Sequence, residues 1–337
     1  MRSAITSFSV ILSFLICGII VWILGANPFV GYSALIQGAL GSIYNICISL
    51  NKAIPLIFVG LSVTLAFRGA TYNIGAEGQL YFGALGAVLI GLNLNTFPII
   101  HILLGLLAAF LGGFLWAFIP AILKFKLRIN EVITTLLLNY VAIYFINFLV
   151  AGPISDHSGL FPQTSAVSLT SRLPIIIPKT RLHAGIIIVL LIALILYITL
   201  KMTIFGYKIN VIGLAPDTAK YAGIKVHRSK MLILMISGGI AGIAGGVEIL
   251  GRQFRLMDGF SPGWGYTGIA VALLGGLEPL GVLLAGIYFG ILEAGANSMQ
   301  RILMIPSAVV YIIESLAVVF VVIGSNLNIK YRSKKRK

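Results

Sequence analysis

The stretch PIIHILLGLLAAFLGGFLWAFIPAIL, residues 98–123, carries no charged side chain. A membrane-spanning helix needs about 20 consecutive apolar residues, so this stretch is long enough to cross a bilayer. It belongs to a longer run, 78–123, that lacks Asp, Glu, Lys and Arg. Similar runs cover residues 3–51, 132–155 and 182–200. These runs predict an all-α protein that crosses the membrane many times.

The composition supports this class. Of the 337 residues, 59% are hydrophobic and 10% are charged, whereas soluble domains carry about 25% charged residues. The net charge of +15 does not indicate nucleic-acid binding, because the basic residues lie between apolar runs rather than on a soluble domain. We therefore expect one transmembrane domain over residues 1–337, with the lipid bilayer as its surroundings and no nucleic acid as a partner.

The apolar runs divide into about ten expected spans. The second and eighth are short, and the even number places both termini on the same side of the membrane. The expected spans are 8–25, 53–67, 74–93, 98–123, 131–151, 183–202, 231–250, 265–277, 280–299 and 306–326.

The distribution of Lys and Arg sets the orientation. With both termini in the cytoplasm, more than two-thirds of the 24 basic residues fall on cytoplasmic segments, as the positive-inside rule requires. The segment 152–182 is then an outer loop, 201–230 is a charged inner loop, and the basic tail 330–337 lies in the cytoplasm beside anionic lipid.

Several polar residues interrupt the apolar spans, and they are densest in residues 73–79, NIGAEGQ. A carboxylate at mid-bilayer costs roughly 2.5–3.5 kcal/mol on insertion scales, so such residues usually face a bundle interior or a water-filled path. Asn73, Glu77 and Gln79 therefore either line a path or support its lining. A second glycine-interrupted segment, 263–276, lies in the other half of the chain. Such pairs of interrupted segments are found around transporter sites.

Two further glycine patterns predict structure. Residues 238–246, GGIAGIAGG, place small residues at four-residue spacing, which is typical of a tight helix–helix seam. In the inner loop, Pro216 and Gly223 bracket a short helix over residues 216–222, with Pro at its start and Gly after its end. Asp217 and Lys220 suit the dipole of such a helix. We expect this helix to contact a soluble partner.

No pattern indicates catalysis by this chain. The sequence contains no G-x-x-x-x-G-K-[ST] phosphate loop, no H-E-x-x-H motif and no Cys/His cluster with metal spacing. No nucleophile–base arrangement stands out. The sequence therefore predicts a protein that is not an enzyme and that needs no cofactor or metal of its own.

The motifs resemble those of a known family, the permease subunits of bacterial ABC-type nucleoside importers, within the ribose and branched-chain amino-acid permease superfamily. The resemblance covers residues 50–325. It is carried by 73–79 (NIGAEGQ), 130–140 (NEVITTLLLNY), 213–224 (GLAPDTAKYAGI), 268–275 (GIAVALLG) and 279–281 (PLG). Residues 276–278, GLE, depart from the family pattern, at an expected inner turn.

The resemblance implies a multi-subunit importer in the bacterial cytoplasmic (inner) membrane. The partners would be a second permease, usually a different chain, an ABC ATPase subunit that hydrolyses ATP, and a substrate-binding lipoprotein of the basic membrane protein type that delivers a nucleoside. The expected substrate path comprises Asn73, Glu77, Gln79, Tyr81, Asn139, Tyr140 and Tyr266, where the tyrosines could stack on a base. The expected ATPase-coupling segment comprises Gly213, Pro216, Asp217, Tyr221, Ala222 and Gly223.

Two alternatives stay open at this point. The substrate of an ABC permease could be a simple sugar. The chain could instead be a proton-coupled secondary transporter, with intramembrane carboxylates as proton carriers, and the candidates are Glu77, Glu248, Glu293 and Glu314.

Overall fold

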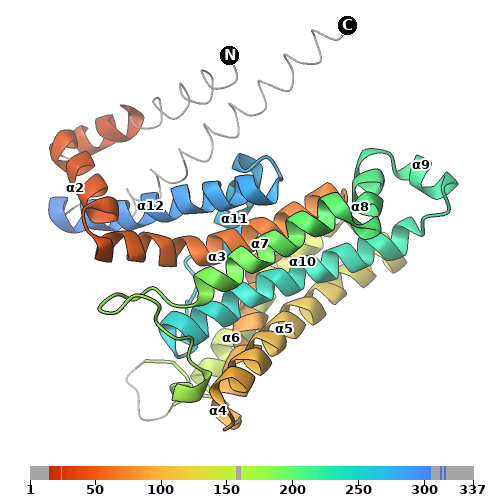
Figure 1. The fold of residues 1–337 in the computed structure, drawn as a ribbon, viewed down its shortest axis with the longest axis horizontal. Helices are drawn as coiled ribbons and strands as arrows, with labels where there is room; N and C mark the ends of the chain where they lie inside the picture. The colour runs from red at the N-terminus through yellow and green to blue at the C-terminus, as the bar shows by residue number, and fades with distance from the viewer. Residues whose placement is uncertain (1–14, 24, 157–160, 305–311, 313–314, 316–337) are drawn as a thin grey trace, which may run out of the picture.

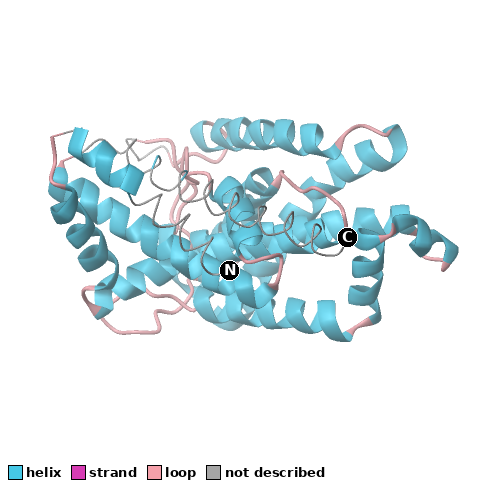
Figure 2. Cartoon of the chain, turned by 90° about the horizontal axis from the view of Figure 1, so that it is seen from above, coloured by secondary structure: helices cyan, strands magenta, loops and turns pink. Residues whose placement is uncertain are grey.

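The structure is a computed structural model that describes residues 15–23, 25–156, 161–304, 312 and 315. The regular elements within these residues are helices (Figures 1 and 2), which confirms the predicted all-α class. After a helix at Leu15–Ile23, the elements are α2 Pro28–Leu40, α3 Ile43–Arg68, α4 Ala76–Asn93, α5 Pro98–Leu127, α6 Glu131–Ala151, η1 Leu169–Ser171, α7 Gly185–Met202, α8 Ile204–Leu214, α9 Pro216–Tyr221, α10 Val226–Glu248, the π-helical turn η2 Ile249–Gln253, α11 Trp264–Leu274 and α12 Pro279–Leu303.

Six of the described helices are long and apolar enough to cross a membrane, and the bent pair Leu15–Ile23 and α2 would make a seventh. Two further expected spans correspond to α4 and α11, of which α11 has only 11 residues. The chain is thus a multi-pass helical protein. The number ten stays a prediction, because the expected tenth span, 306–326, lies outside the described residues apart from two positions.

The N-terminal third differs from the predicted pattern. The expected short second span, 53–67, is the C-terminal part of the 26-residue helix α3, and the preceding region contains a further helix, α2. Polar residues near Pro55 resemble a loop in sequence, but they have partners inside the bundle. Lys52 Nζ lies 2.5 Å from Glu293 Oε1 on α12, and Asn51 Nδ2 donates to the Arg181 carbonyl at 2.5 Å. These contacts allow the helix to continue through a polar stretch.

The helices α4, α5 and α10 meet in a glycine seam, which we define as Gly83, Gly113, Gly238 and Gly242. A Cβ atom on Gly83 would lie 2.1 Å from the Gly242 carbonyl oxygen, and one on Gly113 would lie 2.2 Å from the Gly238 carbonyl oxygen. Any side chain here would overlap with backbone, so only glycine permits the approach. The seam predicted from residues 238–246 is confirmed, and it holds the middle of α4 against α10.

The described part of the loop 152–182, which we expect on the outer side, is bound to the segment that joins α10 to α11. The Thr164 N–H donates to the Leu256 carbonyl at 2.9 Å, and the Val167 N–H donates to the Phe254 carbonyl at 2.8 Å. Arg255 also pairs with Asp156 at 3.3 Å. The described part of the loop 152–182 is therefore packed along residues 250–258 rather than extended away from the bundle.

Candidate functional site

Two helices begin at the same place inside the bundle. The Gly265 N–H, in the first turn of α11, donates to Glu77 Oε2 at 2.5 Å, and Glu77 lies in the first turn of α4. A Cβ on Gly265 would lie 2.3 Å from the Glu77 backbone nitrogen, so the backbones of the two helix starts are in direct contact. The Glu77 carboxylate thus sits at the positive end of α11. The two glycine-interrupted segments of the sequence meet here.

The residues before α4 are held by a buried amide network. Asn73 and Gln79 exchange two hydrogen bonds, of 2.8 and 2.9 Å, between their side-chain amides. Asn73 Nδ2 also donates to Ser237 Oγ of α10 at 2.8 Å. Ser237 Oγ in turn contacts Ser62 Oγ of α3 at 2.9 Å. All four side chains are buried. The non-helical connection between α3 and α4 is therefore bonded to Ser237 of α10, which in turn is bonded to Ser62 of α3.

Asn139 of α6 links the segment between α3 and α4 to α11. Its Oδ1 accepts from the Gly78 N–H at 2.9 Å, and its Nδ2 donates to the Ile74 carbonyl at 2.9 Å. The same Nδ2 lies 3.3 Å from the Tyr266 hydroxyl. Asn139 is fully buried, so one amide fixes the start of α4, the preceding loop and a tyrosine of α11.

The three predicted tyrosines have different positions. Tyr81 is 2% exposed and its ring packs edge-on against Phe260, with centroids 4.7 Å apart. Tyr266 is 36% exposed beside Asn139, and Tyr140 is 51% exposed on α6. Tyr266 therefore joins the buried network to the surface of the chain.

The structure thus separates two groups among the predicted path residues. Asn73, Glu77, Gln79 and Asn139 are buried and bonded to protein atoms, so here they build a frame, whereas Tyr266 and Tyr140 present side chains outside it. We call the first group the site frame.

Gly265 and Phe260 also contact the site frame or Tyr81, and neither was predicted as a site residue. A signal for both was present, because the run 260–265, FSPGWG, combines aromatic residues with turn residues just before a helix.

The other described intramembrane glutamates take part in ion pairs. Glu248 Oε1 lies 2.8 Å from Arg252 and 3.2 Å from Gln253, whose Nε2 also donates to the Phe260 carbonyl at 3.1 Å. Glu293 pairs with Lys52. Glu314 lies outside the described residues. Among the described residues, no group of three His, Cys, Asp or Glu could hold a metal ion.

The expected coupling segment lies at the far end of the bundle, where α9 projects beyond α8 and α10 (Figure 1). The helix covers Pro216–Tyr221, with Ala222 as its C-cap and Gly223 at φ +77°, so the predicted short helix is confirmed to within one residue. Tyr221 is 94% exposed. A Cβ on Gly213 would lie 1.9 Å from the Arg68 carbonyl oxygen, so α8 packs directly on the end of α3.

Residues 276–278, which depart from the pattern of the resembled family, lie at the same end of the bundle as α8. Glu278 forms an ion pair with Arg68 at the C-terminus of α3 and lies 4.0 Å from Lys201 of α7. Its carboxylate therefore joins the ends of α3 and α7 to the start of α12, near α8.

Comparisons with known proteins cover almost the whole chain. A family model described as branched-chain amino acid transport system / permease component matches residues 45–323. The guanosine ABC transporter permease protein NupP of Bacillus subtilis is 37% identical, over 93% of this chain and 91% of the relative. The glucose ABC transporter permease protein TsgB13 of Haloferax volcanii is 33% identical, over 90% and 83%. The nucleoside ABC transporter permease protein NupB of Lactococcus lactis is 31% identical, over 94% and 89%.

Proposed function

The chain belongs to the permease-component family of branched-chain amino acid transport systems, and from this membership we propose that it is the membrane subunit of an ABC importer for nucleosides. As a member of this family it is a multi-pass protein of the cytoplasmic membrane that works with an ATPase and with permease partners. The observation that carries the nucleoside assignment is the similarity, over more than 90% of the chain, to permeases named for guanosine and for nucleosides.

The site frame fits a neutral substrate. A helix N-terminus attracts anions, but here the Glu77 carboxylate already occupies the N-terminus of α11. The Gly265 N–H is therefore already bonded and is not free for an anionic group of a substrate. A nucleoside offers hydrogen-bonding groups and an aromatic face without a fixed charge. Tyr266, partly exposed beside the Asn139 amide, supplies both kinds of contact.

A simple sugar is the second candidate substrate, because one relative is named for glucose. The test is uptake of labelled guanosine, uridine and glucose in cells that lack the chain and in cells that carry it again. We expect nucleoside uptake to be lost and restored while glucose uptake is unchanged. Unchanged nucleoside uptake in the deletion strain, with no other system compensating, would contradict the assignment.

The energy source can be tested in the purified complex. We propose that a separate ATPase drives transport and that a substrate-binding lipoprotein of the basic membrane protein type delivers the nucleoside, docking on the outer loop. Vanadate-sensitive, substrate-stimulated ATP hydrolysis is the expected result. Transport by the lone chain on a proton gradient would favour the secondary-transporter alternative.

Replacement of Tyr221 by alanine tests the role that we propose for α9, which is to enter a groove of the ATPase. Because Tyr221 is 94% exposed, the variant should fold normally. A buried aromatic anchor at an interface is worth about 2 kcal/mol or more, so we expect ATPase affinity to fall by at least about tenfold. Tyr207→Ala, an exposed tyrosine on α8, is the matched control and should bind normally. Equal behaviour of the two variants would remove α9 from the interface.

A further inference from the structure

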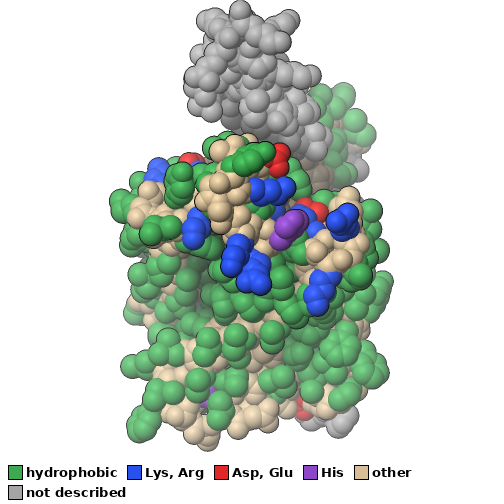
Figure 3. All heavy atoms as spheres, turned by 90° about the vertical axis from the view of Figure 1, so that its right-hand side faces the viewer, with side chains coloured by type: hydrophobic (Ala, Val, Ile, Leu, Met, Phe, Trp, Pro, Cys, Tyr) green, Lys and Arg blue, Asp and Glu red, His purple; other side chains and the backbone are tan. Residues whose placement is uncertain are grey.

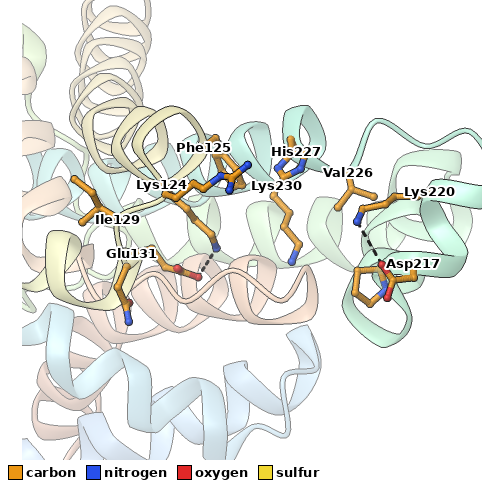
Figure 4. Close-up of a pocket in the computed structure, with 12 residues that line it drawn as sticks. Lys124, Phe125, Ile129, Glu131, Asp217, Lys220, Val226, His227 and Lys230 are labelled. Carbon is orange, nitrogen blue, oxygen red and sulfur yellow. Dashed lines mark hydrogen bonds and ion pairs between the residues drawn. The ribbon is translucent and has the colours of Figure 1, made fainter.

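A cavity of about 610 Å³ opens beside α9 and has no role in the function described so far. Three segments form its wall: the end of α5 with the connection to α6, the helix α9, and the first turns of α10 (Figure 4). Its volume lies within the range of about 300–1,000 Å³ found for pockets that enclose a whole ligand. It can therefore hold several side chains of another molecule.

The cavity wall is basic. On the end of the molecule that carries α9, Lys and Arg side chains gather around a histidine (Figure 3). The lining includes Lys124, Arg128, Lys220, Lys230 and His227, against only two carboxylates, Glu131 and Asp217. We call this site the basic cavity.

Both carboxylates are already bound within the wall. Lys124 pairs with Glu131, and Lys220 Nζ lies 3.3 Å from Asp217 Oδ1 (Figure 4). Neither Arg128 nor Lys230 forms an ion pair within the described part of the chain, and Lys230 Nζ donates to the Ala70 carbonyl at 3.2 Å. An ammonium has three donors, so Lys230 keeps capacity for an incoming acceptor. The charge left over in the basic cavity is positive.

The position of the cavity identifies the partner. The helix α9 forms one wall, so a protein that binds α9 covers the mouth of the cavity as well. A complementary partner would place carboxylates opposite Arg128 and Lys230, because like charges there would repel and a neutral surface would leave both cations without a counter-charge. The partner at this face is the ATPase of the proposed importer.

We infer that the basic cavity receives an acidic segment of the ATPase subunit. Docking then has two parts: α9 enters the ATPase, and an acidic segment of the ATPase enters the permease between α5, α9 and α10. This inference rests on the proposed function only in so far as an ATPase partner exists, and it does not depend on the substrate.

The test is the affinity of the purified permease complex for its labelled ATPase, in uncharged detergent and at low and high salt. We expect Arg128→Glu and Lys230→Glu each to weaken binding by about tenfold or more, because each reversal places like charges together. The salt dependence of binding should also become shallower than in the wild type. Arg128 is exposed, so its variant should fold even if the Lys230 variant does not.

Lys126→Glu is the matched control, since Lys126 is exposed at the end of the same helix α5 but does not line the cavity. Its affinity should stay within about twofold of the wild type, as is common for surface charges. If Arg128→Glu and Lys126→Glu bind the ATPase equally well, the inference is wrong. It is also wrong if Arg128→Glu loses binding of phosphatidylglycerol vesicles while keeping ATPase affinity, because the cavity would then be a lipid site. A wild-type complex that binds no ATPase would overturn the proposed function itself.

Discussion

Nucleoside uptake by a Glu77→Ala variant is expected to fall by about tenfold or more. The substitution removes the acceptor of the Gly265 N–H, a bond of 2.5 Å inside the bundle. A buried donor without a partner costs about 1–3 kcal/mol, and more where a charged group was the partner. It also leaves a gap between the starts of α4 and α11, so both helix starts move and the tyrosine beside Asn139 loses its fixed position. The measurement is initial uptake in cells with equal amounts of membrane-inserted protein.

Glu77→Gln is the control for this prediction. Its amide oxygen can still accept from the Gly265 N–H, and its size matches the original side chain, so a substantial part of the uptake should remain. Two outcomes would contradict the proposed role. Wild-type uptake by Glu77→Ala would show that the helix starts need no acceptor. An inactive Glu77→Gln variant, folded and inserted, would indicate that the protein uses the carboxylate itself, for example as a proton carrier.

Replacement of Gly83 by alanine is expected to destabilise the folded protein by about 3 kcal/mol or more, at or above the upper end of the usual effect of overpacking. The new methyl group would lie 2.1 Å from the carbonyl oxygen and 2.3 Å from the Cα of Gly242. Both are backbone atoms that cannot rotate away, so α4 and α10 must separate. The measurement is the fraction of monodisperse protein that survives heating in detergent.

The direction of the change in stability makes the Gly83 experiment decisive. In an open helix, alanine is preferred to glycine by roughly 0.5–1 kcal/mol, so a helix without a close neighbour would be stabilised. Gly18→Ala serves as the control, because the three atoms nearest to its methyl group would all belong to the Tyr32 side chain, with the hydroxyl at 3.1 Å. A Gly83→Ala protein as heat-resistant as the control would show that the glycine seam is looser than described.

The sequence predicted the features that depend on local pattern. The spans follow from long apolar runs, the helix α9 follows from Pro216 and Gly223 at its two ends, and the seam follows from glycine spacing in α10. The early start of α3 could not be predicted, because Lys52 is stable inside the bundle only through Glu293, which lies 241 positions away. A polar residue in a membrane helix is understandable only once its partner is known.

The site was predicted in its parts but not in its arrangement. Residues 73–79 and 263–276 were both recognised as interrupted segments, yet the Gly265–Glu77 hydrogen bond joins residues 188 positions apart. The tyrosines had equal standing in the sequence, whereas the structure buries Tyr81 and exposes Tyr140. Burial depends on which helix faces are covered by distant elements, and hydrophobic pattern does not distinguish the faces of helices that are apolar all round.

The glycine seam restricts how this protein can change conformation. Helices that pack through side chains can shift past one another by small shear movements, because rotamers readjust at the contact. At the glycine seam between α4, α10 and α5 the backbones themselves touch, and no side chain lies between them that could readjust. A shift along these contacts would drive carbonyl oxygens into neighbouring Cα atoms. We therefore expect these three helices to move as one rigid body, and we expect the rearrangement that admits and releases substrate at its borders with the surrounding helices.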